Sequence, residues 1–189
     1  MSETSLSSIR IRVFVFALIA TMLFSMPSHA TSAPDYTPTG SVRDYFLGAW
    51  RLVSTENKYP DGHTTPYAEF GPDATGFLMY TASGHMCAEL MKRGRHRWAD
   101  DNTPTGSEAA EAFDGFFSYC GTFELRERDH VMVHHPETSA SPNWVGTSQE
   151  RPYYLVSENR FFFRGQRKEK QKDGTELSVT WTITWERLK

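Results

Sequence analysis

Apolar and polar residues alternate most clearly near the end of the chain. The apolar residues of this stretch occupy every second position, with threonine between them: Val179, Trp181, Ile183 and Trp185. Successive side chains of a β-strand point to opposite faces of its sheet. The pattern therefore predicts a strand over residues 175–188 with one apolar face and one polar face.

Seven earlier segments also have the composition and alternation of strands, and we expect them over residues 50–56, 76–81, 85–91, 119–125, 130–135, 151–156 and 160–164. Short turn sequences connect most of them, as at Asp173-Gly174. Strands do not alternate with long helices, which disfavours a parallel sheet. An antiparallel meander removes its two edges by closing on itself. We predict an all-β domain that forms an eight-stranded antiparallel up-and-down β-barrel, whose interior is filled or holds one small ligand.

One short helix interrupts the predicted strands. Thr105 and Glu108 have the spacing of a capping box, and helix-forming residues follow over 108–117. This segment lies between the third and the fourth predicted strand. Residues 42–47 could form one helical turn before the first strand.

The N-terminal segment has the pattern of a secretory signal peptide. Arg10 and Arg12 precede an uncharged apolar run over residues 13–26, and small residues follow up to Ala30. The run is about 14 residues long, whereas a membrane-spanning helix needs about 20. We expect cleavage after Ala30, with Ala33 as the second choice; an uncleaved anchor is the alternative. The mature protein is then exported, periplasmic or secreted, without a membrane span.

The remaining chain divides into a linker and a folded domain. Residues 31–44 contain many proline, serine and threonine residues, which is typical of a flexible linker. The predicted barrel domain covers residues 45–189.

Composition and charge exclude several classes of protein. The formal net charge is −3, so the chain lacks the basic excess with which proteins neutralise a nucleic-acid backbone. Two cysteines cannot form a four-thiolate zinc site. Sequence signatures of serine hydrolases, zinc proteases, phosphate loops and dinucleotide-binding folds are missing. We therefore expect no metal, no cofactor and no nucleic-acid partner.

The first and last strands agree about which face points inward. Trp50, Leu52 and Ser54 share a face of the first strand, and Arg187 follows the apolar face of the last strand. A guanidinium group over an indole ring contributes about 0.5–2 kcal/mol, depending on its desolvation. We expect a structural stack of Trp50 with Arg187 at the floor of the barrel.

These residues also indicate a family. Gly48-Ala49-Trp50 is similar to the Gly-x-Trp opening of lipocalins, and Arg187 lies where they have a basic partner. The chain more specifically resembles the bacterial and fungal lipocalin-like domain proteins over about residues 45–188. The matching segments are residues 48–54, 78–86, 88–91, 119–123, 134–135 and 142–147. The resemblance implies a calycin-type barrel and a cavity rather than a particular reaction.

Candidate ligand-binding residues are those expected on the inward faces or over an open end: Tyr80, Met86, Tyr119, Phe123, His134, His135, Trp144 and Trp181. Gly121 is expected on an inward face, where it would leave space for a lumen. A second candidate region is the basic run over residues 92–97, which ends at Trp98. It is either a solvated loop or a mouth that attracts carboxylate or phosphate ligands.

The adjacent His134 and His135 cannot bind one metal ion together, because neighbours on a strand point to opposite faces. One of them faces the lumen. Val131 and Val133 favour His135, Met132 favours His134, and the choice stays open. The inward histidine is either a structural group or a group that contacts the ligand.

The two cysteines lie on strands that should be antiparallel neighbours. Cys87 and Cys120 are both expected on the outer face. A disulfide forms between them only if they are directly opposed, with Cα atoms about 4.4–6.8 Å apart. An exported protein would permit this bond; two free thiols are the alternative.

Three functions agree with these features. The first is an exported barrel that binds a small apolar or amphipathic molecule in its lumen. The second is an isomerase, cyclase or hydrolase that uses a lumenal His and Tyr as acid and base. The third is a filled barrel that acts as a structural or interaction module.

Overall fold

The computed structural model describes residues 36–189, so the predicted signal peptide and the beginning of the linker lie outside the described residues. The elements, in chain order, are α1 (Val42–Phe46), β1 (Gly48–Lys58), β2 (Thr64–Thr65), β3 (Thr75–Tyr80), β4 (His85–Met91), α2 (Gly106–Asp114), β5 (Phe116–Arg126), the 3-10 turn η1 (Glu127–Asp129), β6 (Val131–Ser139), the 3-10 turn η2 (Pro142–Trp144), β7 (Gln149–Ser157), β8 (Arg160–Lys170) and β9 (Glu176–Arg187).

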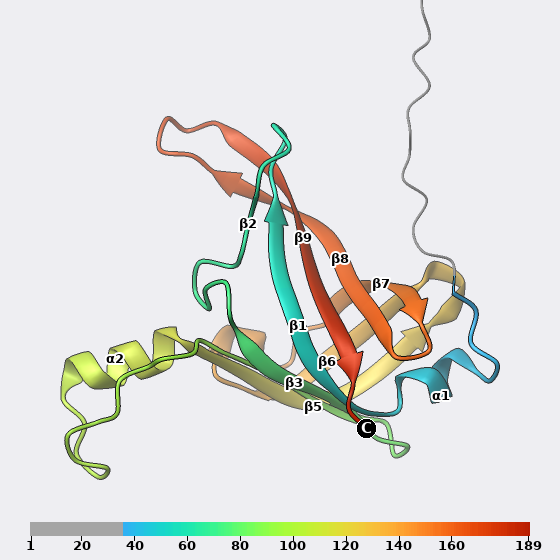
Figure 1. Cartoon of the computed structure of the whole chain (residues 1–189), viewed down its shortest axis with the longest axis horizontal. Coiled ribbons are helices and arrows are strands. Elements are labelled where there is room, and N and C mark those ends of the chain that lie inside the picture. The colour runs from blue at the N-terminus through green and yellow to red at the C-terminus, as the bar shows by residue number, and fades with distance from the viewer. Residues whose placement is uncertain (1–35) are drawn as a thin grey trace, which may run out of the picture. The chain divides into compact units, whose positions relative to one another are not determined.

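Eight strands close into an antiparallel barrel. Each strand from β3 to β8 pairs with the next along the chain, and β1 pairs with both β3 and β9. The two-residue strand β2 pairs only with the far end of β1 and is an appendage of the barrel. Figure 1 shows β1 and β9 lying side by side, which is the pairing that closes the sheet. The predicted eight-stranded up-and-down barrel is confirmed.

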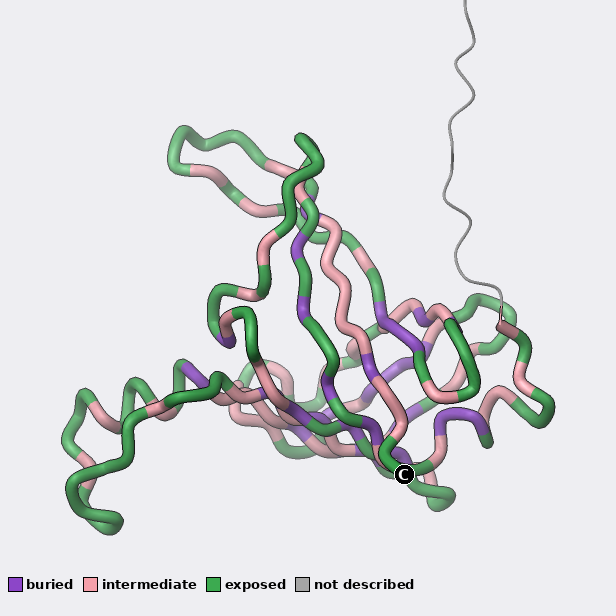
Figure 2. Tube along the Cα trace, in the orientation of Figure 1, coloured by how far each residue is buried: buried purple, intermediate pink, exposed green. Residues whose placement is uncertain are grey.

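Helix α2 lies between the third and fourth barrel strands, as predicted. Thr105 and Glu108 form the expected capping box. The helix ends at Asp114 and not at the predicted Phe117, because Gly115 caps it and the chain continues directly into β5. None of its residues is buried, and Figure 2 shows the helix and the loop before it as mostly exposed.

One end of the barrel is closed by α1, which includes residues 42–44 of the segment expected to be a linker. Its last residue, Phe46, is completely buried. The Phe46 ring packs edge-on against Tyr153 and Phe161, with 5.0 Å between ring centres in both pairs. The helix therefore forms the floor of the lumen.

The Trp50–Arg187 contact fixes this floor to the terminal strands. The guanidinium carbon of Arg187 lies 4.1 Å from the centre of the Trp50 ring. Arg187 also donates hydrogen bonds to the backbone carbonyl groups of Tyr45 and Leu47. The indole N–H of Trp50 donates to the Phe46 carbonyl at 2.8 Å. The side chain that stacks on Trp50 thus also binds the end of α1.

A bulge in β1 makes the prediction for Ser54 wrong. Leu52 pairs with Trp185, but Ser54 pairs with the adjacent Thr184, so the register shifts at Val53. An extra residue in one strand reverses the faces of the residues that follow it. Ser54 is consequently exposed, and the inward positions beyond the bulge belong to the buried Thr55 and Asn57.

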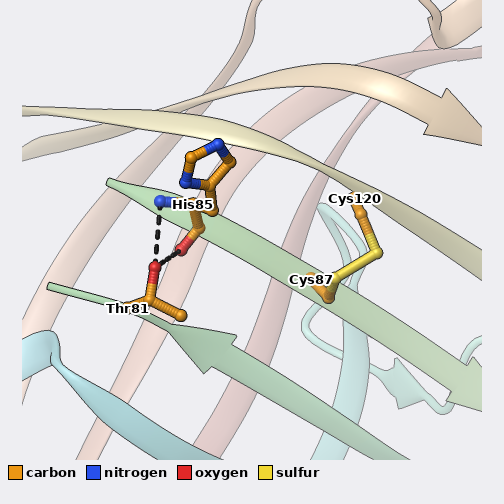
Figure 3. Close-up of a disulfide and its surroundings, with 4 residues drawn as sticks. All are labelled: Thr81, His85, Cys87 and Cys120. Atoms are coloured by element: carbon orange, nitrogen blue, oxygen red, sulfur yellow. Dashed lines mark hydrogen bonds between the residues drawn. A yellow bond between two sulfur atoms is a disulfide. The ribbon is translucent and has the colours of Figure 1, made fainter. Parts of the chain in front are cut away.

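Cys87 and Cys120 are directly opposite each other on β4 and β5. The structure joins them in a disulfide on the outer face of the sheet, with 4.1 Å between their Cα atoms (Figure 3). In the same view Thr81 closes the β3–β4 turn. Its hydroxyl accepts a hydrogen bond from the backbone N–H of His85 and donates one to the His85 carbonyl.

Candidate functional site

The barrel encloses a cavity of about 690 Å³ that opens to solvent. Its deep walls are formed by buried residues of the inward faces: Leu78, Ala88, Leu90, Tyr119, His134, Phe163 and Trp185. Exposed residues line its mouth, among them Glu69, Phe113, Asp114 and Arg167. A lumen of this size and aromatic content is suited to a small molecule.

His134 is the inward histidine, and it is 1 % exposed. Both ring nitrogens contact tyrosine hydroxyls: Tyr80 lies 2.6 Å from Nε2 and Tyr119 lies 2.7 Å from Nδ1. The three groups come from β3, β5 and β6, with β4 between the first two, and form one hydrogen-bonded unit. Only His134 and Tyr119 reach the cavity wall.

Burial controls the protonation of this unit. It lowers the pKa of His134 well below its usual range, and the positive charges of Arg151 and of His135 when protonated lower it further. Burial likewise raises the pKa of Tyr80 and of Tyr119, although Arg151 offsets part of the increase at Tyr119. At neutral pH the histidine is a neutral imidazole and both tyrosines carry their protons.

Arg151 is the charged residue beside this unit. Its guanidinium carbon lies 5.4 Å from the centre of the Trp144 ring and 5.6 Å from that of Trp181. Cation–π contacts of this kind stabilise a partly desolvated cation. Within residues 36–189, no carboxylate oxygen lies within 4.0 Å of its guanidinium nitrogens.

Two further tryptophans line the cavity. Trp144, in η2, packs against Phe117 and Tyr119 with ring centres 4.7 and 5.3 Å apart. Trp181 on β9 lies across from Gly165 on β8. A Cβ atom at Gly165 would lie 2.5 Å from the Trp181 ring, so only glycine leaves room for the indole in this position.

The eight predicted ligand residues fall into three groups. The cavity is lined by Tyr119, His134, Trp144 and Trp181. A second group is buried without lining it: Tyr80, Met86 and Phe123. His135 points outward, where it contacts Ser148 and Glu124, and its prediction as a ligand residue is not supported by this placement.

The basic run over residues 92–97 is separate from the lumen. All of its residues except Arg93, together with Trp98, line a different pocket of about 510 Å³ beside α2. Arg95 donates to the Ala112 carbonyl, and His96 contacts the carboxylate of Glu111. The run therefore packs on α2, and it does not form the mouth of the barrel.

Two parts of the cavity wall were not predicted from the sequence: Arg151, and the segment before β3 that contains Tyr67 and Phe70. Tyr67 and Phe70 precede β3 and line the cavity, but no periodic pattern marks them. Arg151 did leave a signal, because it shares the inward face of β7 with Tyr153 and Leu155. An arginine on the same face as the apolar Tyr153 and Leu155 is the feature that could have been singled out.

Comparison with known families decides the classification. The model of a family described as a lipocalin-like domain matches residues 47–188, which is most of the chain. The chain belongs to the lipocalin-like domain family. The matched range starts just before β1 and ends after β9, so the family domain coincides with the closed barrel.

Two proteins illustrate the similarities of this lipocalin-like domain. It is 30% identical over 78 residues to the 4'-hydroxy-3'-methoxypropiophenone carrier protein ppsC of Aspergillus oryzae, covering 37% of this chain and 70% of that protein. Among solved structures, it matches a bovine odorant-binding protein in complex with a selenium-containing odorant, with 12% identity, a TM-score of 0.36, and coverage of 82% of this chain and 78% of the other.

Proposed function

We propose that this protein is an exported carrier that binds one small amphipathic molecule in the lumen of its barrel. The observation that carries the proposal is the open cavity of about 690 Å³, whose walls are aromatic and include the polar groups of Tyr119 and His134. Such a combination of apolar area with a few directed polar groups is typical of small-molecule sites. The relative named as a carrier of an aryl ketone supports this class of ligand. Export is supported by the signal-peptide pattern of residues 1–30 and is tested separately below.

The proposal is tested by filling the lumen. Ala88 lies on the cavity wall, and its neighbour Glu89 points to the outer face. We expect a panel of fatty acids, retinoids and polycyclic probes to contain at least one micromolar ligand, about −8 kcal/mol. Ala88→Phe should weaken binding of that ligand at least about tenfold, which is about 1.4 kcal/mol. Glu89→Phe places the same ring outside and should leave the affinity unchanged.

Binding is measured by isothermal titration and by quenching of tryptophan fluorescence, because Trp181 and Trp185 line the cavity. Native mass spectrometry of protein isolated from its own cells then looks for a retained molecule. If no probe binds and no small molecule is retained, the carrier function is refuted.

Acid–base catalysis by a lumenal His and Tyr has less support. Both nitrogens of His134 already contact Tyr80 and Tyr119, so neither one faces the cavity as a free base. A general base must reach the proton that it removes. The arrangement is better suited to holding Tyr119 in position than to catalysis by the imidazole.

A further inference from the structure

The polar groups of the lumen restrict the chemistry of the ligand. We propose that the cavity binds an organic carboxylate with an apolar body, and that Arg151 and Tyr119 hold its carboxylate group. This inference rests on the lumen being a ligand site, as proposed above, and adds the class of ligand.

The neutral state of His134 fixes the direction of the hydrogen bonds around it. A neutral imidazole has one donor nitrogen and one acceptor nitrogen. Among the described residues the Tyr80 hydroxyl has one partner, Nε2 of His134, and it is buried. Its proton is satisfied only if Tyr80 donates to Nε2, because an unpaired buried hydroxyl proton is costly. Nδ1–H of His134 then donates to the Tyr119 oxygen, and the Tyr119 proton is left for a group in the cavity.

Arg151 supplies the positive charge at the cavity wall. Its contacts with Trp144 and Trp181 hold the cation in this position. Nη1 donates to the neighbouring Glu150 carbonyl, and the guanidinium also lies close enough to Tyr119 to lower the pKa of that hydroxyl. The guanidinium fork pairs with a carboxylate through two parallel hydrogen bonds. Within the described part of the chain, no protein carboxylate occupies that place.

The other charged groups of the cavity do not replace Arg151. Arg167 forms an ion pair with Glu169 at 2.6 Å. Glu69 and Asp114 are exposed at the mouth, where solvent screens them. The charge nearest to the His134 unit is therefore positive.

Trp185 lies on the same wall. Its indole nitrogen is buried and has no hydrogen-bond partner among residues 36–189, while other atoms of Trp185 line the cavity. Arg151 and Tyr119 are the donors that face the lumen. Oxygen atoms that accept hydrogen bonds, together with a negative charge, are the chemistry that complements them.

The test compares three probes of nearly equal size: 2-naphthoate, 2-naphthamide and 2-acetylnaphthalene. Titration calorimetry with the purified protein at pH 7.5 should give an affinity for 2-naphthoate at least about tenfold higher than for either neutral probe. Arg151→Gln should remove this preference by weakening the naphthoate complex alone. Arg151→Lys, which keeps the charge without the fork, should retain part of it. Tyr119→Phe should weaken the naphthoate complex about threefold to tenfold.

The matched control is Arg164→Gln. Arg164 is exposed on the outer face of β8, so its loss changes the net charge equally without altering the lumen. We expect it to leave all three affinities within about twofold, since surface charges are screened. Far-UV circular dichroism verifies that each variant is folded, and Arg151→Lys replaces Arg151→Gln if the latter is not.

The outcomes separate the two proposals. If the three probes bind equally, the lumen does bind small apolar molecules but the carboxylate inference is wrong. A carboxylate preference that survives Arg151→Gln, or that Arg164→Gln also removes, overturns it as well. If none of the probes binds, the carrier function loses its support together with this inference.

Discussion

At the residue scale, two polar side chains of the interior are satisfied in different ways. Arg187 is half-buried at the floor of the barrel, where Trp50 and two backbone carbonyl groups surround its guanidinium. His134 is deeper in the lumen and stays neutral between Tyr80 and Tyr119. The charged group is thus paired with a ring and with carbonyl oxygens, and the imidazole is neutral and hydrogen-bonded, so neither is left unpaired in the interior.

Removal of the Arg187 side chain should destabilise the domain. Arg187→Ala loses the stack on Trp50 as well as the bonds to the end of α1, and we expect a loss of about 1–3 kcal/mol in the free energy of unfolding. Urea denaturation measures it. The control is Arg160→Ala, which removes an exposed ion pair with Glu186 and should cost less than about 1 kcal/mol. Equal losses in the two variants would show that the stack contributes no more than a surface ion pair.

The neutral state of His134 should make stability depend on pH. Burial keeps the pKa of folded His134 well below its usual range, whereas in the unfolded chain it is close to 6.5. As the pH falls below that value, the unfolded state takes up a proton that the folded state does not, so unfolding becomes more favourable.

Between pH 7.5 and 5.5 the wild type should therefore lose about 1.4 kcal/mol more than His134→Gln, whose amide does not titrate in this range. Urea denaturation at the two pH values gives the comparison. Parallel pH profiles for the two proteins would contradict a neutral, buried His134.

At the element scale, alternation predicts a strand but not its irregularities. The faces of β4 and β9 follow their sequence alternation, and the first half of β1 does as well. Beyond the bulge at Val53 the alternation continues with inverted faces. A second irregularity lies between Cys120 and Gly121, where β5 pairs with β6. A Cβ atom at Gly121 would lie 2.0 Å from the His135 carbonyl oxygen, so this glycine permits a close backbone approach and does not enlarge the lumen as expected.

The disulfide between β4 and β5 should stabilise the pair of strands on both sides of α2. The bond spans 33 residues, and the entropy of closing such a loop corresponds to about 3–4 kcal/mol. We expect the free energy of unfolding of the Cys87→Ser/Cys120→Ser variant to be lower by this amount. Its urea transition then lies at a lower urea concentration. A thiol titration of unreduced, denatured protein should find no free thiol, and two free thiols per chain would contradict the bridge.

At the scale of the whole molecule, the barrel is closed at one end and open at the other. Phe46 and Arg187 seal the floor, while the polar residues of the mouth and the aromatic Phe113 surround the opening. Within residues 36–189, the lumen therefore opens at the end bordered by Glu69, Phe113 and Asp114. No helix among residues 36–189 has the length and hydropathy to cross a membrane.

Export is expected to remove residues 1–30. Protein recovered from the periplasm or the medium should begin at Thr31, because Ser28 and Ala30 are the small residues that signal peptidase prefers before its cleavage site. N-terminal sequencing and the intact mass measure this. Ala30→Arg should accumulate as the uncut precursor. A mature protein that keeps Met1 would show that the segment is an anchor.

Local sequence patterns are sufficient to predict the strands, the capped helix and the closed barrel. These features depend on local alternation and local capping, and edges without partners leave closure as the favourable solution. The sequence also placed Tyr119, Trp144 and Trp181 among the cavity residues, because each belongs to an aromatic face or loop.

Only the tertiary structure decided which histidine faces the lumen, which residues follow the bulge inward, and that Cys87 is opposite Cys120. Each of these depends on the register between strands that are distant in sequence, and a shift of one residue exchanges the two faces. The position of Arg151 beside Tyr119 and His134 has the same origin, since β5, β6 and β7 bring the three together. The chemistry of the lumen is therefore a property of strand register rather than of any local motif.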